Sequence, residues 1–255
     1  MHRLTSIVLA LAPLTFAACG DDPGAHATAR FAGATDAQLL RAIDAARFED
    51  AEALFEAGAE LFASTTSTCP RVTTAGQVST VTTDCTNDDG LALTGSMIIT
   101  NFGFAQGPAR DPAVPSTIEV DHLVVAGIAP TRIDGTLAIE VAEPIDDQPF
   151  HIDAALDFAD GGLPAHTEGA LDCDGAELCT VDGWIGVDGL GEATVDPAPF
   201  QRSRGRLVLH GADTLTVELA VDDQGCRTAT IDGATRTLCD GAFRRPPSRL
   251  GALGR

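Results

Sequence analysis

The chain has 255 residues, 44% of them apolar, a length and composition that fit one large globular domain or two small ones. Its 37 acidic residues outnumber its 16 basic residues and give a formal net charge of −21. Because neutralising nucleic-acid phosphates requires a face rich in lysine and arginine, we expect no nucleic-acid partner.

Residues 1–18 have the three regions of a secretory signal peptide. Met1-His2-Arg3 is basic, residues 4–14 are apolar, and small residues follow. The apolar run is shorter than the roughly 20 residues that cross a bilayer, and no later run reaches that length. We therefore expect an exported protein without a transmembrane helix.

The end of this signal contains a lipid-attachment motif. Phe16-Ala17-Ala18-Cys19 resembles the lipobox of bacterial lipoproteins, although leucine is usual at the position of Phe16. The resemblance covers only the start of the chain. It implies cleavage before Cys19, a diacylglyceryl group on its sulfur and an acylated amino terminus. Gly20 in place of aspartate implies sorting to the outer membrane. Ordinary signal cleavage after Ala18 is the alternative.

The cysteines fit an oxidising compartment. Seven are present, and lipidation of Cys19 leaves six, an even number suited to three disulfides. Their spacing contains neither a C-x-x-C redox motif nor a zinc motif. The six fall into three local pairs, which are Cys69 with Cys85, Cys173 with Cys179 and Cys226 with Cys239.

The mature chain begins with a predicted tether followed by a predicted helical segment. Residues 19–35 are small and polar, as in a flexible tether between lipid and domain. Apolar residues then recur at helical spacing, which predicts one or two amphipathic helices over 36–63. Thr35 or Asp36 could cap the first helix.

Beyond Cys69 the pattern changes to that of antiparallel strands. Valine, threonine, isoleucine and leucine alternate with polar residues, and glycine, aspartate or proline interrupts them every 8 to 12 residues. We expect about eleven or twelve strands. The predicted fold is all-β, an antiparallel meander that forms a barrel or a strongly twisted sheet, with the helical segment on one face or in one end. A two-sheet sandwich is the alternative.

These elements predict one β-rich domain over 36–243. The glycine-containing dipeptides that recur along it are too irregularly spaced for a solenoid, so we interpret them as turns and bulges of the meander. Residues 244–255 contain arginine and proline and are expected to be disordered.

Two hairpin registers follow from turns and cysteines. A two-residue turn at Asp232-Gly233 places Cys226 opposite Cys239, within disulfide reach. A five-residue connection after Cys173 places Leu171 opposite Val181. A third hairpin is predicted over residues 69–85, with its turn at Ala75-Gly76-Gln77. This hairpin needs a bulge or a three-residue loop.

One cluster of polar residues could bind a ligand. A turn at Asp160-Gly161 places Asp157 opposite Pro164, so that His166 has two aspartates as diagonal neighbours on a polar face. The full cluster consists of His166, Asp153, Asp157, Glu168 and Trp184. It could hold a divalent cation or a small polar ligand. The alternative is a solvated sheet face with paired histidines and carboxylates.

His122 is expected on the apolar side of its strand. Strict alternation puts His122 on the same face as Ile118, Val120 and Val124, which predicts a histidine in the core or at its rim.

The sequence shows no known catalytic motif. We therefore expect a lipid-anchored, non-enzymatic lipoprotein of the cell envelope that acts as a structural, interaction or ligand-binding module. Its partner would be a small ligand or an envelope protein, and no cofactor is expected. A lipid or lipoprotein carrier with an apolar cavity is the second hypothesis. An enzyme using the His166 cluster is the third.

Overall fold

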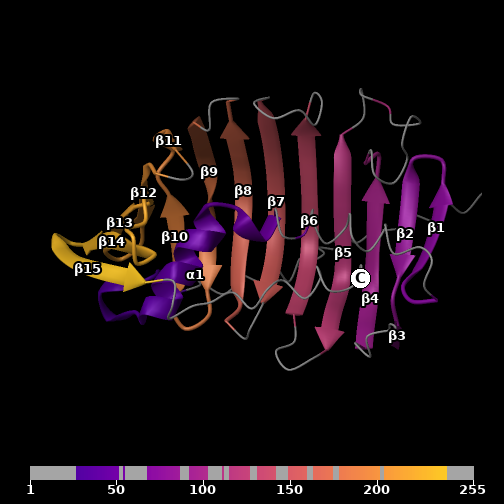
Figure 1. The fold of residues 1–255 in the computed structure, drawn as a ribbon, viewed down its shortest axis with the longest axis horizontal. Helices are drawn as coiled ribbons and strands as arrows, with labels where there is room; N and C mark the ends of the chain where they lie inside the picture. Colours follow the sequence, from indigo (N-terminus) through magenta and orange to yellow (C-terminus); the bar gives the residue numbers. More distant parts are fainter. Residues whose placement is uncertain are drawn as a thin grey trace, which may run out of the picture.

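The computed structural model describes residues 27–51, 54, 68–86, 92–102, 111, 115–126, 131–141, 149–159, 163–174, 178–201 and 204–239. They form one antiparallel β-sheet with a helix on one face (Figure 1). The helical elements are η1 (Phe31–Gly33) and α1 (Asp36–Ala46). The strands are β1 (Arg71–Ala75), β2 (Val78–Thr82), β3 (Cys85–Thr86), β4 (Ala92–Thr100), β5 (Ser116–Ala126), β6 (Thr131–Val141), β7 (Phe150–Ala159), β8 (Ala165–Cys173), β9 (Leu178–Val187), β10 (Gly191–Val195), β11 (Phe200–Gln201), β12 (Arg206–His210), β13 (Thr214–Glu218), β14 (Cys226–Ile231) and β15 (Ala234–Cys239).

The sheet is an open meander. Strands pair in the order β1-β2-β4-β5-β6-β7-β8-β9-β10-β12-β13-β14-β15, while β3 pairs with β4 and β11 with β9. The all-β prediction is confirmed in its twisted-sheet form, because the described strands form a single sheet that does not close. The 15 described strands exceed the expected number, partly because β3 and β11 are only two residues long.

Alternation along the strands gives the sheet two different faces. In β7, Ile152, Leu156 and Phe158 are buried, whereas Asp153 and Asp157 between them are exposed. We call the buried side the inner face and the other side the outer face. The apolar core lies on the inner face, and polar side chains gather on the outer face.

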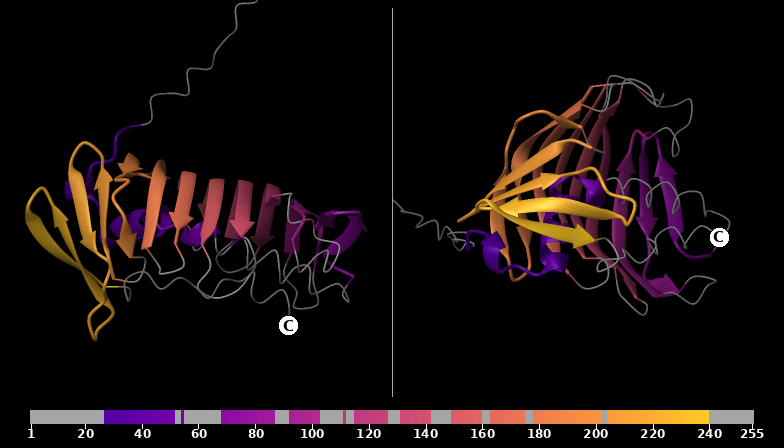
Figure 2. Two further views of the ribbon diagram at one scale, coloured as in Figure 1. Left: turned by 90° about the horizontal axis from the view of Figure 1, so that it is seen from above. Right: turned by 60° about the vertical axis from the view of Figure 1, so that its left-hand side comes forward.

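Helix α1 packs on the inner face. Its start is fixed by a capping box between Thr35 and Gln38, and its core-facing residues include Leu39 and Ile43. The Thr167 hydroxyl of β8 donates to the carbonyl of Ala45 at 3.2 Å. Figure 2 shows β12–β15, in orange and yellow, curling at the end of the sheet where helix α1 lies. The helix is thus enclosed between the long strands and this curled part of the sheet.

The predicted helical segment is interrupted. Helix α1 ends at Ala46, and Phe48 has a positive φ of 59°. Residues 49–51 and 54 are helical again, and the rest of the 52–67 stretch lies outside the described residues. Among the described residues, no helix has the length and apolar character required to cross a membrane.

One predicted register is wrong, and a buried arginine holds the connection concerned. Asp157 pairs with His166, not with Pro164, because the connection from β7 to β8 is longer than a two-residue turn. The Arg41 guanidinium donates to the carbonyl of Phe158 at 2.9 Å and to that of Leu163 at 3.2 Å. These long-range bonds hold both sides of the connection, and no local sequence pattern contains them.

The glycine-containing dipeptides lie inside strands as well as at turns, and one of them marks a bulge. Gly95, Gly135 and Gly169 lie inside strands with φ between 98° and 144°. At Gly95 the register of β4 against β5 shifts, and a Cβ there would lie 2.3 Å from the carbonyl oxygen of His122. Asp232-Gly233 forms the predicted two-residue turn, since Ile231 pairs with Ala234.

All three predicted disulfides are present. Cys226 pairs with Cys239 and Cys173 with Cys179 in the predicted registers, with Cα atoms 3.9 Å and 4.1 Å apart. The 69–85 hairpin turns through two residues, because Ala75 pairs with Val78. Its irregularity lies at the opposite end, at Asp84, whose φ is positive.

Candidate functional site

A hollow of about 1010 Å³ opens on the outer face, over strands β5 to β10. We call it the outer-face groove. Five carboxylates line it, namely Asp134, Asp157, Glu168, Asp188 and Glu192. The described lining also includes two histidines, one arginine and the single tryptophan of the chain. Its polar groups make it the leading candidate for a binding site.

His166 is the centre of the predicted cluster. Its Nδ1 lies 3.0 Å from the Asp157 carboxylate, and its Nε2 lies 3.5 Å from Glu168. The imidazole stacks on the Trp184 ring with centroids 4.4 Å apart. The registers explain this grouping, because His166 is paired with Asp157 and Glu168 is paired with Trp184. Four of the five predicted residues therefore meet in the outer-face groove.

The fifth predicted residue, Asp153, lies elsewhere on the outer face. Its carboxylate is 3.0 Å from Nε2 of His151, and it pairs with Ala170 in the β7–β8 ladder. The expected contact with His166 depended on the incorrect two-residue turn. The corrected register replaces a diagonal approach by a direct pairing of His166 with Asp157.

His122 corrects the expectation of a core histidine. Its side chain is 81% exposed, and it lies on a β-bulge, where the register of β5 against β6 shifts between Val120 and Leu123. A bulge redirects side chains, so alternation counted from Ile118 fails here. His122 has a positive φ of 49°. It lines the outer-face groove together with Asp134.

His122 forms a second polar cluster with two aspartates. Its Nδ1 is 2.6 Å from Asp121 and its Nε2 is 3.6 Å from Asp134. The hydrogen bond that the His122 ring donates to Asp121, followed by the charge of Asp134, raises the pKa of His122. One ligand atom from each residue lies within 4.8 Å of the others, an arrangement that can hold a divalent cation. Sequence reasoning missed this group because nothing local predicts the bulge.

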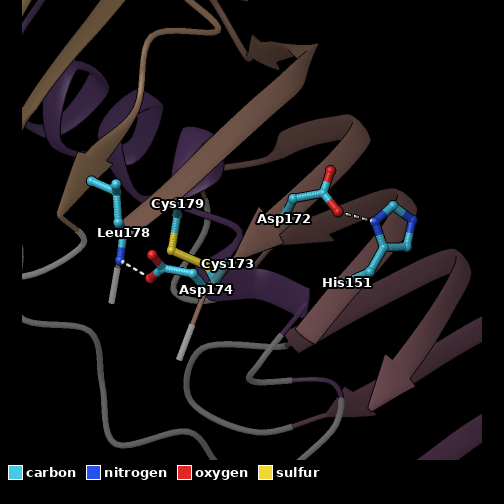
Figure 3. The surroundings of a disulfide bond; sticks show 6 residues. All are labelled: His151, Asp172, Cys173, Asp174, Leu178 and Cys179. Atoms are coloured by element: carbon cyan, nitrogen blue, oxygen red, sulfur yellow. Dashed lines mark hydrogen bonds and ion pairs between the residues drawn. A yellow bond between two sulfur atoms is a disulfide. The ribbon is translucent and has the colours of Figure 1, made fainter. Parts of the chain in front are cut away.

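Two more histidines lie on the outer face. His151 contacts Asp172 at 2.6 Å, and this hydrogen bond raises the pKa of His151 (Figure 3). His210 lies 3.1 Å from Asp196. The pKa of Asp196 is lowered, first by the backbone N–H of Ala198 and then by His210. Every histidine that the structure describes is therefore on the outer face beside a carboxylate.

The Cys173–Cys179 disulfide lies at the closed end of the β8–β9 hairpin, beside the paired side chains of His151 and Asp172. Figure 3 shows Asp172 pointing toward His151 while the next residue, Cys173, is bonded to Cys179. Asp174 accepts a hydrogen bond from the backbone N–H of Leu178 at 2.9 Å and closes the connection. These bonds fix the β8–β9 register that places Glu168 beside Trp184.

Comparisons of the chain with protein-family profiles, curated proteins and solved structures gave no match.

Proposed function

We propose that the protein is a lipid-anchored binding module of the bacterial cell envelope that holds a polar ligand in the outer-face groove without catalysing a reaction. The observation behind the proposal is the stack of His166 on Trp184, flanked by Asp157 and Glu168, inside the groove. Aromatic and ionisable side chains converging in a hollow are typical of a binding site.

Export is supported by the disulfides. Three local bridges form and persist in oxidising compartments outside the cytoplasm. The lipid anchor rests on the lipobox-like residues ending at Cys19 and the outer-membrane location on Gly20, all of which lie outside the described residues. Lipidation would leave the remaining six cysteines fully paired.

The groove presents the groups that binding requires. Its described lining contains five carboxylates, two histidines, one arginine and one tryptophan. Binding requires only the complementary charges and the aromatic surface that the lining supplies.

The ligand is expected to be polar. Besides the outer-face groove, a smaller hollow of about 450 Å³ opens on the same face and is bordered by Glu119, Asp153 and Asp182. Carboxylates in both hollows would be costly to desolvate against acyl chains. This favours a polar ligand over the lipid-carrier hypothesis.

Filling the groove tests the proposal. Gly186 lies opposite His166, and a Cβ there would meet its neighbours at ordinary contact distances of 3.7–3.8 Å. Gly186→Phe should therefore fold and obstruct the groove. Thr180→Phe is the matched control, on the outer face of the same strand and outside the groove lining.

The measurement is native mass spectrometry of each full-length protein extracted from its own membranes in mild detergent. Wild type and Thr180→Phe should retain a non-covalent ligand that Gly186→Phe lacks. The same ligand content in all three proteins would contradict binding in the groove.

A further inference from the structure

We propose that the ligand of the outer-face groove is an extended arginine- or lysine-rich segment of a partner protein. The inference rests on the proposed function and names the chemistry of its ligand. It follows from the charge, the arrangement and the width of the groove.

Charge complementarity is the first argument. The described groove lining contains five carboxylates, against one guanidinium, that of Arg132, and two histidines. The acidic character extends beyond the groove, since the described outer-face residues of β5–β9 comprise nine carboxylates and that single arginine. The nine are Glu119, Asp121, Asp134, Glu140, Asp153, Asp157, Glu168, Asp172 and Asp182. Such a surface attracts a polycation and repels an anion.

The arrangement of the carboxylates is the second argument. Asp134 pairs directly with Asp157 in the β6–β7 ladder. Like charges placed directly opposite each other destabilise a sheet. Each aspartate contacts a histidine on its other side, Asp134 with His122 and Asp157 with His166. A cationic side chain lying between the two carboxylates would remove the remaining repulsion.

Accessibility and aromatic character are the third argument. The Asp157 side chain is 73% exposed and the Glu168 side chain is 54% exposed, so both can contact an incoming group. Trp184 lies next to them in the groove lining. His166 stacks on one face of the indole ring, and an arginine bound by these carboxylates would be placed to interact with the rest of this ring, the aromatic group that binds cations best.

The width of the groove indicates a chain and not a single cation. It extends over the six neighbouring strands β5 to β10. At a strand spacing of about 4.8 Å this width is about 24 Å, and an extended peptide rising about 3.4 Å per residue needs roughly seven residues to cross it. The carboxylates therefore match the basic residues of a short extended segment.

The test is calorimetric titration of the full-length protein in detergent with a seven-residue lysine peptide at low salt. The groove variant Asp134→Asn/Asp157→Asn/Glu168→Gln removes three charges from the groove. The control variant Glu140→Gln/Glu218→Gln/Asp223→Asn removes three exposed charges outside it.

Wild type and the control variant should bind the peptide with similar affinity, and the groove variant should bind about tenfold more weakly, as expected for the loss of several exposed ion pairs. Equal weakening in both variants would overturn the proposal, because the peptide would then respond only to net charge. Spermine binding as tightly as the peptide would also overturn it, because the groove would then not select an extended chain.

Two further outcomes distinguish the sources of a failure. If the peptide binds only after residues 244–255 are deleted, the arginines of this chain occupy the groove and the partner is excluded. If the peptide does not bind any form, but native mass spectrometry still finds a ligand that Gly186→Phe loses, the proposed function stands and the cationic ligand is wrong.

Discussion

Histidine–carboxylate pairs are the main ionisable feature of the outer face at the scale of single residues. His122 and His151 both have a raised pKa, and in each the largest cause is a hydrogen bond to an aspartate. A histidine with a raised folded-state pKa adds stability that is fully present below its unfolded pKa of about 6.5 and is lost as the pH rises through the folded pKa. The outer face is therefore held together better in mild acid.

Replacing His151 with glutamine should reduce this pH dependence. The free energy of unfolding of wild type minus that of His151→Gln is expected to be larger at pH 5 than at pH 8.5. Because the pair with Asp172 is partly exposed, the change should be below about 1 kcal/mol. Urea unfolding followed by Trp184 fluorescence measures it. Asp172→Asn should give a smaller change in the same direction, because Asp153 still contacts His151. A difference that is equal at the two pH values would refute the role of His151.

Replacing Arg41 should affect stability far more. Arg41 and Asp50 form an ion pair whose two side chains are each 2% exposed. Arg41→Met removes the cation beside a buried carboxylate and the donors to two carbonyls of the β7–β8 connection, so the expected loss is about 3–5 kcal/mol.

The double variant Arg41→Met/Asp50→Leu should recover part of that loss, because it no longer buries the carboxylate. Equilibrium urea unfolding gives both values. A loss below about 1 kcal/mol in the single variant would show that this pair does not anchor the β7–β8 connection.

Glycines with a positive φ are the decisive feature at the scale of strands. Gly135 has a φ of 124°, and a Cβ there would lie 2.0 Å from the carbonyl oxygen of Ala155. Gly135→Ala must shift the β6 or β7 backbone and should cost about 1–3 kcal/mol in unfolding free energy. Gly33→Ala should stay within about 0.5 kcal/mol, because no atom would lie within 4 Å of its Cβ. Similar losses in both variants would contradict the steric argument.

Local signals predicted some of these elements well. The Asp232-Gly233 turn and the Cys226–Cys239 pair both lie within one hairpin, so the sequence contained all the information needed for its register. The predicted β7–β8 register is wrong because the connection between these strands is longer than a two-residue turn. That connection is held by Arg41, which is more than one hundred residues away along the chain. The exposed site of His122 was missed because it depends on a bulge between neighbouring strands. Local pattern therefore predicted much of the His166 cluster, whereas tertiary contacts decided its exact pairing.

Membrane attachment can be tested at the scale of the whole molecule. If Cys19 is lipidated, Cys19→Ser should move the protein from the membrane fraction to the soluble exported fraction. Two or more acyl chains anchor a protein stably, so the transfer should be nearly complete. Immunoblotting of the separated fractions checks it, with Cys226→Ser/Cys239→Ser as a control that should stay with the membrane. Membrane association that survives Cys19→Ser would contradict the lipid anchor.

Occupancy of the outer-face groove is tested most directly by acrylamide quenching of Trp184, the only tryptophan in the chain. The full-length protein would be extracted in low-salt detergent and measured before and after a wash with 1 M salt, which screens exposed ion pairs. If a cationic ligand occupies the groove, quenching should increase after the wash in wild type and remain constant in Gly186→Phe. Unchanged quenching of wild type would contradict a ligand held in the groove by charge.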